Sequence, residues 1–202
     1  VVAPSAISLK SFGQQKEHDA REMTAEEIEQ TIRDFGEATR RAIEAGFDGV
    51  EIHGANHYLI HQFVSPYYNR RNDVWADNYK FPVAVIDEVV KAKKAHANDD
   101  FIIGYRLSPE EAESPGISME ITEELIHQIA NKPLDYIHVS LMDVNSVTRE
   151  GKYKGENRLK LIHQWINGRM PLIGIGSVFT AEDALNAVEN IGVEFVALGR
   201  EI

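Results

Sequence analysis

Residues Glu51–Phe63 read EIHGANHYLIHQF, and the pattern of apolar residues changes within this stretch. The apolar residues of the preceding FDGV indicate a buried strand, whereas those of YLIHQF recur at the three- and four-residue steps of a helix. His53 is therefore expected at the end of a strand, with Asn56 and Tyr58 just beyond it. In parallel α/β proteins, ligands bind at this edge of the sheet.

These three side chains are an imidazole, an amide and a phenol, and they lie within six residues of one another. Together they can donate hydrogen bonds to one carbonyl oxygen and hold a proton ready for a neighbouring atom. A lone histidine at a strand end is commonly a structural group, but the pattern H-x-x-N-x-Y adds two further polar groups. We therefore predict a catalytic site formed by His53, Asn56 and Tyr58.

A metal site is not expected in this stretch. His53, His57 and His61 follow one another at steps of four residues, a spacing that would suit metal ligands. However, no carboxylate of suitable spacing lies nearby in the sequence, and the three histidines straddle the end of a strand.

The composition is that of an ordinary globular domain. Of 202 residues, 43% are hydrophobic and 26% are charged, and the net charge of −11 argues against nucleic acid or an anionic membrane as a partner. The chain has no cysteine, which excludes disulfides and thiolate metal sites and is typical of cytoplasmic proteins. We expect a cytoplasmic protein with a small-molecule substrate; the sequence leaves the oligomeric state open, with a homo-oligomer among the alternatives.

The rest of the chain alternates strands with amphipathic helices. Strands are expected near residues 49–53, 101–107, 135–139, 172–175 and 195–198. Helices are expected near residues 24–45, 58–63, 82–94, 122–129, 158–166 and 180–191, with Thr24, Thr122 and Thr180 as N-terminal caps. Residues 1–22 are expected to form an irregular lead-in. Because no hairpin signal separates the strands, we predict a parallel sheet with right-handed crossovers.

Both a doubly wound sheet and a (β/α)8 barrel fit these five strand–helix units. No strand is followed by G-x-G-x-x-G, which removes the main sign of a dinucleotide-binding sheet. Five units are too few to close a barrel of eight, but they would serve as its second part if three units preceded Val1. The start without methionine and the end just past a strand favour a fragment, so we expect one incomplete domain over residues 1–202.

Glycine turns follow the last two expected strands, in GIGSVFT and ALGRE. Backbone N–H groups at Gly176 and Ser177, next to a helix N-terminus, would form an anion site. In barrels, the loops after strands seven and eight commonly bind phosphate, and Arg200 beside Gly199 would add a charged fork. The alternative is two glycine turns with a surface arginine, which the pairing on consecutive strands disfavours.

Arg106 lies near the end of the expected strand FIIGYRL, which is otherwise apolar. An arginine there must find an anion or an electron-rich partner, and an ion pair to a neighbouring strand is the structural alternative. The long loop from residue 65 to residue 81 carries aromatic residues and two arginines. The sequence does not decide whether this loop is a lid or a surface loop.

The motifs together resemble the old yellow enzyme family of NAD(P)H:flavin oxidoreductases. The similarity is carried by FDGVEIHGANHYLIHQFVSPYYNRRND, and APSAI, REMTAEEIEQTIRDF, GYRLSPEE, PLIGIGSVFTAEDAL and ALGRE occur in the same order as in that family. The resemblance implies an FMN-containing (β/α)8 barrel, of which this chain would hold strands four to eight. It implies a reaction in which NAD(P)H reduces FMN and FMN then passes hydride to an activated alkene, such as an α,β-unsaturated carbonyl.

The resemblance also implies a role for each predicted site residue. His53 and Asn56 match the pair that hydrogen-bonds the substrate carbonyl oxygen, and Tyr58 matches the proton donor. Arg106 matches the arginine beside the N1 and O2 edge of the flavin, where reduction builds negative charge. The residues that match the phosphate cradle of FMN are Gly176, Ser177, Gly199 and Arg200.

Two departures from the family pattern matter. The family's glycine-rich D-x-x-G-G-S-x-x-N-R stretch is replaced by NDVWADNYKF, which is shorter and lacks glycine. The first three strands are also absent, so we expect this stretch alone to hold FMN weakly and to be inactive. Two alternatives stay open: a phosphate-binding aldolase or isomerase barrel, which the lack of a lysine at any strand end disfavours, and a non-catalytic barrel fragment.

Overall fold

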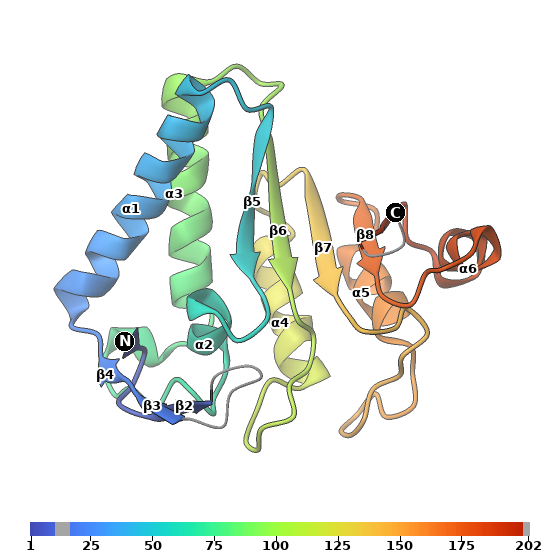
Figure 1. The fold of residues 1–202 in the computed structure, drawn as a ribbon, viewed down its shortest axis with the longest axis horizontal. Coiled ribbons are helices and arrows are strands. Elements are labelled where there is room, and N and C mark those ends of the chain that lie inside the picture. The colour runs from blue at the N-terminus through green and yellow to red at the C-terminus, as the bar shows by residue number, and fades with distance from the viewer. Residues whose placement is uncertain (11–16, 200–202) are drawn as a thin grey trace.

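The computed structural model describes residues 1–10 and 17–199, and its main feature is a five-stranded parallel sheet (Figure 1). The strands are β5 (Gly49–Gly54), β6 (Ile102–Leu107), β7 (Tyr136–Ser140), β8 (Leu172–Ile175) and β9 (Phe195–Ala197). Each strand pairs with the next one along the chain. A doubly wound sheet reverses its strand order at a switch point, whereas a sequential order is that of a barrel wall. The predicted partial (β/α)8 barrel is therefore confirmed.

Helices connect the strands and cover one side of the sheet. They are α1 (Ala25–Glu44), α2 (Leu59–Val64), α3 (Lys80–His96), α4 (Met119–Ile129), α5 (Arg158–Ile166) and α6 (Ala181–Asn186), which a short π-helix, η2 (Ala187–Ile191), continues. Helices α1 and α3 run side by side (Figure 1). A Cβ at Gly36 would lie 2.8 Å from Cγ of Glu88, so a glycine at this position allows α1 to approach α3 closely.

The two faces of the sheet differ in polarity. The face packed against the helices carries apolar side chains that are at most 3% exposed: Ile52, Ile103, Tyr105, Ile137 and Val139. The residues between them alternate to the other face, which is polar and carries Glu51, His53, Arg106 and His138. This alternation differs from the continuous apolar runs of strands that are buried on both faces. It places several charged and polar side chains together on one face.

Two of the three predicted N-terminal caps are confirmed, those of α1 and α6. The prediction that Thr122 caps α4 was wrong. The Thr24 side chain accepts from the Glu27 N–H, and the Glu27 carboxylate accepts from the Thr24 N–H; Thr180 begins α6 in the same way. Thr122 does not cap α4, which begins one turn earlier, after Ser118. Met119 is fully buried, so its packing extends the helix at its N-terminus. The Thr122 hydroxyl instead donates to the Pro109 carbonyl at 2.7 Å and anchors the β6–α4 loop.

The lead-in, which we expected to be irregular, contains short strands. Strand β1 (Val2–Ala3) pairs in parallel with β4 (Arg21–Glu22), and β2 (Ser8–Lys10) pairs antiparallel with β3 (Glu17–Asp19). Runs of two or three residues have no readable period, and their pairing is set by partners elsewhere in the chain. The irregular lead-in was therefore a wrong prediction for these segments.

The segment from residue 65 to residue 79, which connects α2 to α3, packs against the body of the protein. Trp75, in the short 3-10 helix η1 (Val74–Ala76), is 6% exposed, and the Asn69 amide donates to the carbonyls of Phe63 and Trp75. Arg71 donates to the carbonyls of Pro4 and Met23 and so ties this loop to the lead-in. Among the described helices, none combines the length and the apolar character that a membrane crossing requires.

Candidate active site

His53 lies near the carboxyl end of β5, and its neighbours along this edge of the sheet are also polar. It is in register with Arg106 on β6, which is in register with His138 on β7. Parallel strands bring their carboxyl ends to one edge, so the turns after β5 and β8 share this edge. The predicted catalytic histidine and the predicted anion-binding turn therefore lie at the same end of the strands.

Tyr58 lies against His53. The two ring centroids are 5.0 Å apart with an interplanar angle of 49°, and Tyr58 is the residue at the N-terminus of α2. Tyr58 is 63% exposed, so its hydroxyl is accessible to a ligand that lies over this edge. The sequence stretch thus folds back within five residues and brings the imidazole next to the phenol.

Asn56 is held by the neighbouring loop. Its backbone N–H donates to the Ser108 hydroxyl at 3.0 Å, and that hydroxyl donates to Asn56 Oδ1 at 3.3 Å. The φ angle of Asn56 is 58°, in the left-handed region that asparagine tolerates better than most residues. This geometry leaves the amide NH2 of Asn56 as a donor, because the carbonyl oxygen is already engaged.

Electrostatics keep His53 neutral. Burial lowers the pKa of His53, and the positive charge of Arg106 lowers it further, against an opposing effect of Glu51. At neutral pH the ring therefore carries one N–H. A neutral imidazole can donate one hydrogen bond to a carbonyl oxygen without carrying a charge into the site.

Arg106 is only partly satisfied by its neighbours. Its Nη2 donates to the Ser140 hydroxyl at 2.9 Å. Its Nε is buried and has no hydrogen-bond partner among the residues that the structure describes. A buried donor of a charged group without an acceptor is costly, so this side chain is suited to an acceptor supplied by a ligand.

Three further polar residues meet on the same face of the sheet. Glu51 Oε2 accepts from the Tyr136 hydroxyl at 3.0 Å and pairs with His138 Nδ1 at 2.9 Å. Burial raises the pKa of Glu51, but the hydrogen bonds from His138 and Tyr136 and the charges of His138 and Arg106 together outweigh burial, so the pKa lies below its ordinary value. Burial and the Glu51 carboxylate raise the pKa of Tyr136 to about 12.

This cluster was not predicted from the sequence, although the sequence contains a signal for it. Tyr136 and His138 alternate with apolar residues in YIHVS, as Glu51 does in VEIH. Such alternation indicates a shared polar face, but it does not identify partners two strands apart. Gly104 makes the contact feasible, because a Cβ there would lie 2.0 Å from Cζ of Tyr136.

The turn after β8 has the conformation expected for a close backbone approach. Gly176 has a φ angle of 125°, and a Cβ there would lie 2.6 Å from the Asp143 nitrogen and 2.7 Å from the Leu141 oxygen. Ser177 also has a positive φ angle, 51°, and its hydroxyl donates to the Met142 carbonyl at 2.8 Å. The Ser177 hydroxyl is thus engaged in shaping the turn.

The last turn of the predicted anion site is described in part. Gly199 is exposed and follows β9, the neighbour of β8 in the sheet. Arg200, which we predicted to add a charged fork, lies outside the described residues.

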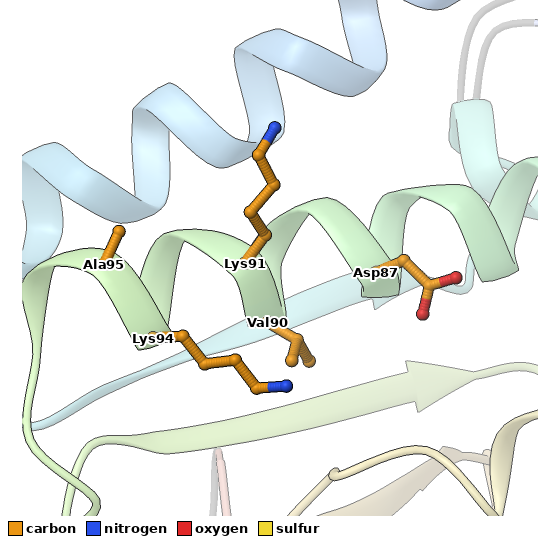
Figure 2. A pocket seen from close by; sticks show the side chains of 5 residues that line it. All are labelled: Asp87, Val90, Lys91, Lys94 and Ala95. Carbon is orange, nitrogen blue, oxygen red and sulfur yellow. The ribbon is translucent and has the colours of Figure 1, made fainter.

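One hollow of about 400 Å³ lies elsewhere, along α3 (Figure 2). Its lining side chains all come from this one helix: Asp87, Val90, Lys91, Lys94 and Ala95. In Figure 2 they point in different directions, and Lys91 points toward α1. A binding site needs polar groups that converge, so this hollow on the outer helix layer does not compete with the strand edge.

The chain is similar to known flavin oxidoreductases. A family model described as the NADH:flavin oxidoreductase / NADH oxidase family matches residues 2–202. The probable NADH-dependent flavin oxidoreductase YqiG of Bacillus subtilis is 52% identical over 187 residues, which are 91% of this chain and 50% of that protein. The NADH:acrylate oxidoreductase of Vibrio harveyi is 44% identical, over 89% of this chain and 18% of that protein.

A solved structure supports the fold. The structure of morphinone reductase in complex with tetrahydroNAD matches with a TM-score of 0.76 and 25% identity, over 98% of this chain and 55% of that one. The chain therefore spans at most about half the length of each of these three proteins.

Proposed function

The chain belongs to the NADH:flavin oxidoreductase / NADH oxidase family, and we propose that it is the FMN-binding and substrate-binding part of an ene-reductase-type oxidoreductase. The resemblance noted in the sequence is thereby confirmed. The substrate class that we propose is an activated alkene such as an α,β-unsaturated carbonyl. The observation that carries this proposal is the arrangement of His53, Tyr58 and Arg106 along one strand edge, with the Gly176 turn at the same edge.

Two features of the structure fit FMN. The buried Nε of Arg106 lacks an acceptor among the described residues, and the flavin ring carries acceptors along its N1 and O2 edge. In the turn after β8, Gly176 and Ser177 both have positive φ angles, and consecutive backbone N–H groups in such a turn can form a concavity that binds an anion. We propose that Gly176, Ser177, Gly199 and Arg200 hold the FMN phosphate through their backbone and, for Arg200, its guanidinium.

When bound, FMN supplies the hydride chemistry, with NAD(P)H as the reductant. The residues of this chain bind and polarise the substrate. The neutral His53 ring and the Asn56 amide each donate a hydrogen bond to the substrate carbonyl oxygen, which draws electron density from the alkene. Tyr58 protonates the α-carbon from its exposed hydroxyl.

Arg106 and its neighbours set the charge beside the cofactor. We propose that its guanidinium would lie against the N1 and O2 edge of the flavin. A positive charge there would stabilise the negative charge that the flavin gains on reduction. Ser140 holds one nitrogen of the guanidinium and so orients it. The Glu51 carboxylate, which also interacts with Arg106, balances part of that positive charge.

The wider setting follows from the same proposal. We propose that the chain supplies strands four to eight of an eight-stranded barrel whose first three strand–helix units lie outside it, and that it holds FMN weakly alone. Its partners would be small molecules, since a net charge of −11 disfavours nucleic acid and anionic membranes. We propose that the protein lies in the cytoplasm, a reducing compartment in which disulfides are rare, because the chain has no cysteine and so forms no disulfide.

The visible absorption spectrum of the purified full-length protein tests this proposal. We expect the bands of bound oxidised flavin, bleached by NADH or NADPH without oxygen and restored by an enone. A full-length protein without flavin, even after addition of FMN, would contradict the proposal. A flavin that is bleached but not restored by any enone, nitroalkene or unsaturated thioester would contradict the substrate class alone.

A further inference from the structure

His57, His61 and Glu111 converge beside the strand edge. His61 Nε2 lies 2.8 Å from Glu111 Oε2, and His57 Nδ1 lies 3.7 Å from the same oxygen. One ligand atom from each of the three residues lies within 4.8 Å of the other two. Two imidazole nitrogens and a carboxylate oxygen at such distances form a compact set of donors for a cation.

The carboxylate of Glu111 is held in a fixed orientation. Its Oε1 accepts from the Ser65 hydroxyl and, at 2.8 Å, from the Ile117 N–H. These bonds leave Oε2 directed at the two imidazoles. Partners of this kind, which orient a ligand through its second atom, are typical of metal sites.

The histidines are held by α2 and by the turn before it. His61 lies in α2, and its side chain and that of Glu111 are both fully buried. The backbone of His57 has a φ angle of 60°, and its carbonyl accepts from the Gln62 amide at 2.7 Å. The side chain of His57 is 42% exposed, so the site is reached from solvent on the side of His57.

We propose that His57, His61 and Glu111 bind one divalent transition-metal ion of the Zn2+ class, with a fourth position open to solvent beside His57. Two histidines and one carboxylate are a ligand set that zinc takes, with bond lengths of about 2.0–2.2 Å. Binding replaces the hydrogen bond between His61 and Glu111 by two metal–ligand bonds, and it draws His57 closer to Glu111. The ion takes the place of the proton between His61 Nε2 and the carboxylate, and that proton moves to Nδ1 of His61, which has no hydrogen-bond partner among the described residues.

A simpler interpretation is a buried hydrogen-bonded His61–Glu111 pair. That pair would account for two of the three residues, but it gives no role to His57, whose Nδ1 faces the same oxygen. The buried Oε2 of Glu113 has no hydrogen-bond partner among the described residues, and its carboxylate interacts electrostatically with His57. A second carboxylate that acts on His57 adds negative charge on the His57 side of the site, which favours a cation.

The sequence argued against a metal because no carboxylate of suitable spacing lies near these histidines. Glu111 comes instead from the β6–α4 loop, 50 positions away from His61. The site connects this loop to the turn that carries Asn56 and Tyr58. The hydrogen bond between Asn56 and Ser108 connects the same two segments. An ion would therefore fix the position of the turn on which the proposed catalytic residues lie, but its binding does not require the flavin.

Calorimetric titration with Zn2+ alone tests the proposal, on the full-length protein freed of metal by a chelator and prepared without a histidine tag. We expect one equivalent to bind. His57→Ala leaves the buried His61–Glu111 pair intact but removes one proposed ligand. Loss of a residue that only orients a ligand lowers metal affinity by about 10- to 100-fold, and we expect His57→Ala to lower the affinity for Zn2+ by more than this. His127→Ala, which removes an exposed histidine of α4, is the matched control and should bind as the wild type does.

Other results decide against the site. No binding by the wild type, or equal binding by wild type and His57→Ala, would overturn the proposal. Co2+ gives a second readout, because a four-coordinate ion with these ligands absorbs in the visible range and His57→Ala should abolish that absorption. Glu111→Gln should also prevent binding; if that variant does not fold, the comparison of His57→Ala with His127→Ala decides alone.

Discussion

His53 lies beside Arg106 at the carboxyl ends of two neighbouring parallel strands. The guanidinium charge adds to the effect of burial in lowering the pKa of His53, so the imidazole is neutral when it faces a ligand. The same arginine has a buried Nε that a ligand acceptor can satisfy. One residue pair thus offers a neutral donor for a substrate and a charged donor for a cofactor.

His53→Ala should weaken the binding of phenols and enones to the oxidised protein. Loss of one hydrogen bond to the ligand oxygen costs roughly 1–3 kcal/mol, which is about 5- to 150-fold in the dissociation constant. A spectral titration of the flavin measures this change. His127→Ala should bind these ligands as the wild type does, and unchanged affinity in His53→Ala would remove His53 from the substrate site.

Gly104→Ala should destabilise the protein. The added Cβ would lie 2.0–2.5 Å from Cζ, Cε2 and the hydroxyl oxygen of Tyr136, so this side chain would have to shift away from its hydrogen bond to Glu51. Overpacking of this kind costs about 1–3 kcal/mol in the free energy of unfolding, measured by urea titration. Tyr136→Ala removes the clash, so Gly104→Ala should cost much less in that background. An equal cost in both backgrounds would show that the ring does not limit this position.

The Glu51–His138 pair should make stability depend on pH in the acidic range. The pKa of Glu51 in the folded state lies below its ordinary value of 4.5, so its contribution is present above that pH and is lost as the pH falls further. Glu51→Gln should lower the free energy of unfolding by about 1–2 kcal/mol at pH 7. The difference from the wild type should shrink below pH 4.5. A difference that is constant from pH 7 to pH 3 would exclude this linkage.

Thr24→Ala should destabilise α1 through the loss of its capping box. The Thr24 hydroxyl accepts from the Glu27 N–H at 3.2 Å, and loss of such a cap costs about 0.5–2 kcal/mol. Thr31→Ala is a suitable comparison, since Thr31 lies in the same helix and donates to a helix carbonyl rather than capping an end. Equal stability of Thr24→Ala and wild type, in thermal unfolding followed by circular dichroism, would show that the cap contributes nothing.

Local patterns in the sequence predicted what local contacts determine. The five strands were predicted to within one or two residues, because apolar runs such as PLIGI are bounded by turns and helices. The caps at Thr24 and Thr180 were predicted because each box lies within four residues. The prediction of a cap at Thr122 was wrong because the burial of Met119, a tertiary effect, extends α4 at its N-terminus.

Contacts between distant segments were not predictable in this way. Glu51 meets His138 from 87 positions away, and Glu111 meets His61 from 50 positions away. Each partner is an unremarkable polar residue in its own segment, and only the register of the strands and the course of the β6–α4 loop bring it into contact. The positions of His53 and Tyr58 could be predicted because they lie in one segment.

Tyr58→Phe tests the central claim most directly, because the exposed hydroxyl of Tyr58 is removed while the ring that lies against His53 is kept. Stopped-flow absorption measures the reduction of the flavin by NAD(P)H and its reoxidation by an enone as separate steps. We expect an unchanged rate for the first step and a rate for the second that falls by about 10²- to 10⁴-fold, the usual contribution of a positioned proton donor. An equal loss in both steps, or no loss in the second, would contradict the account.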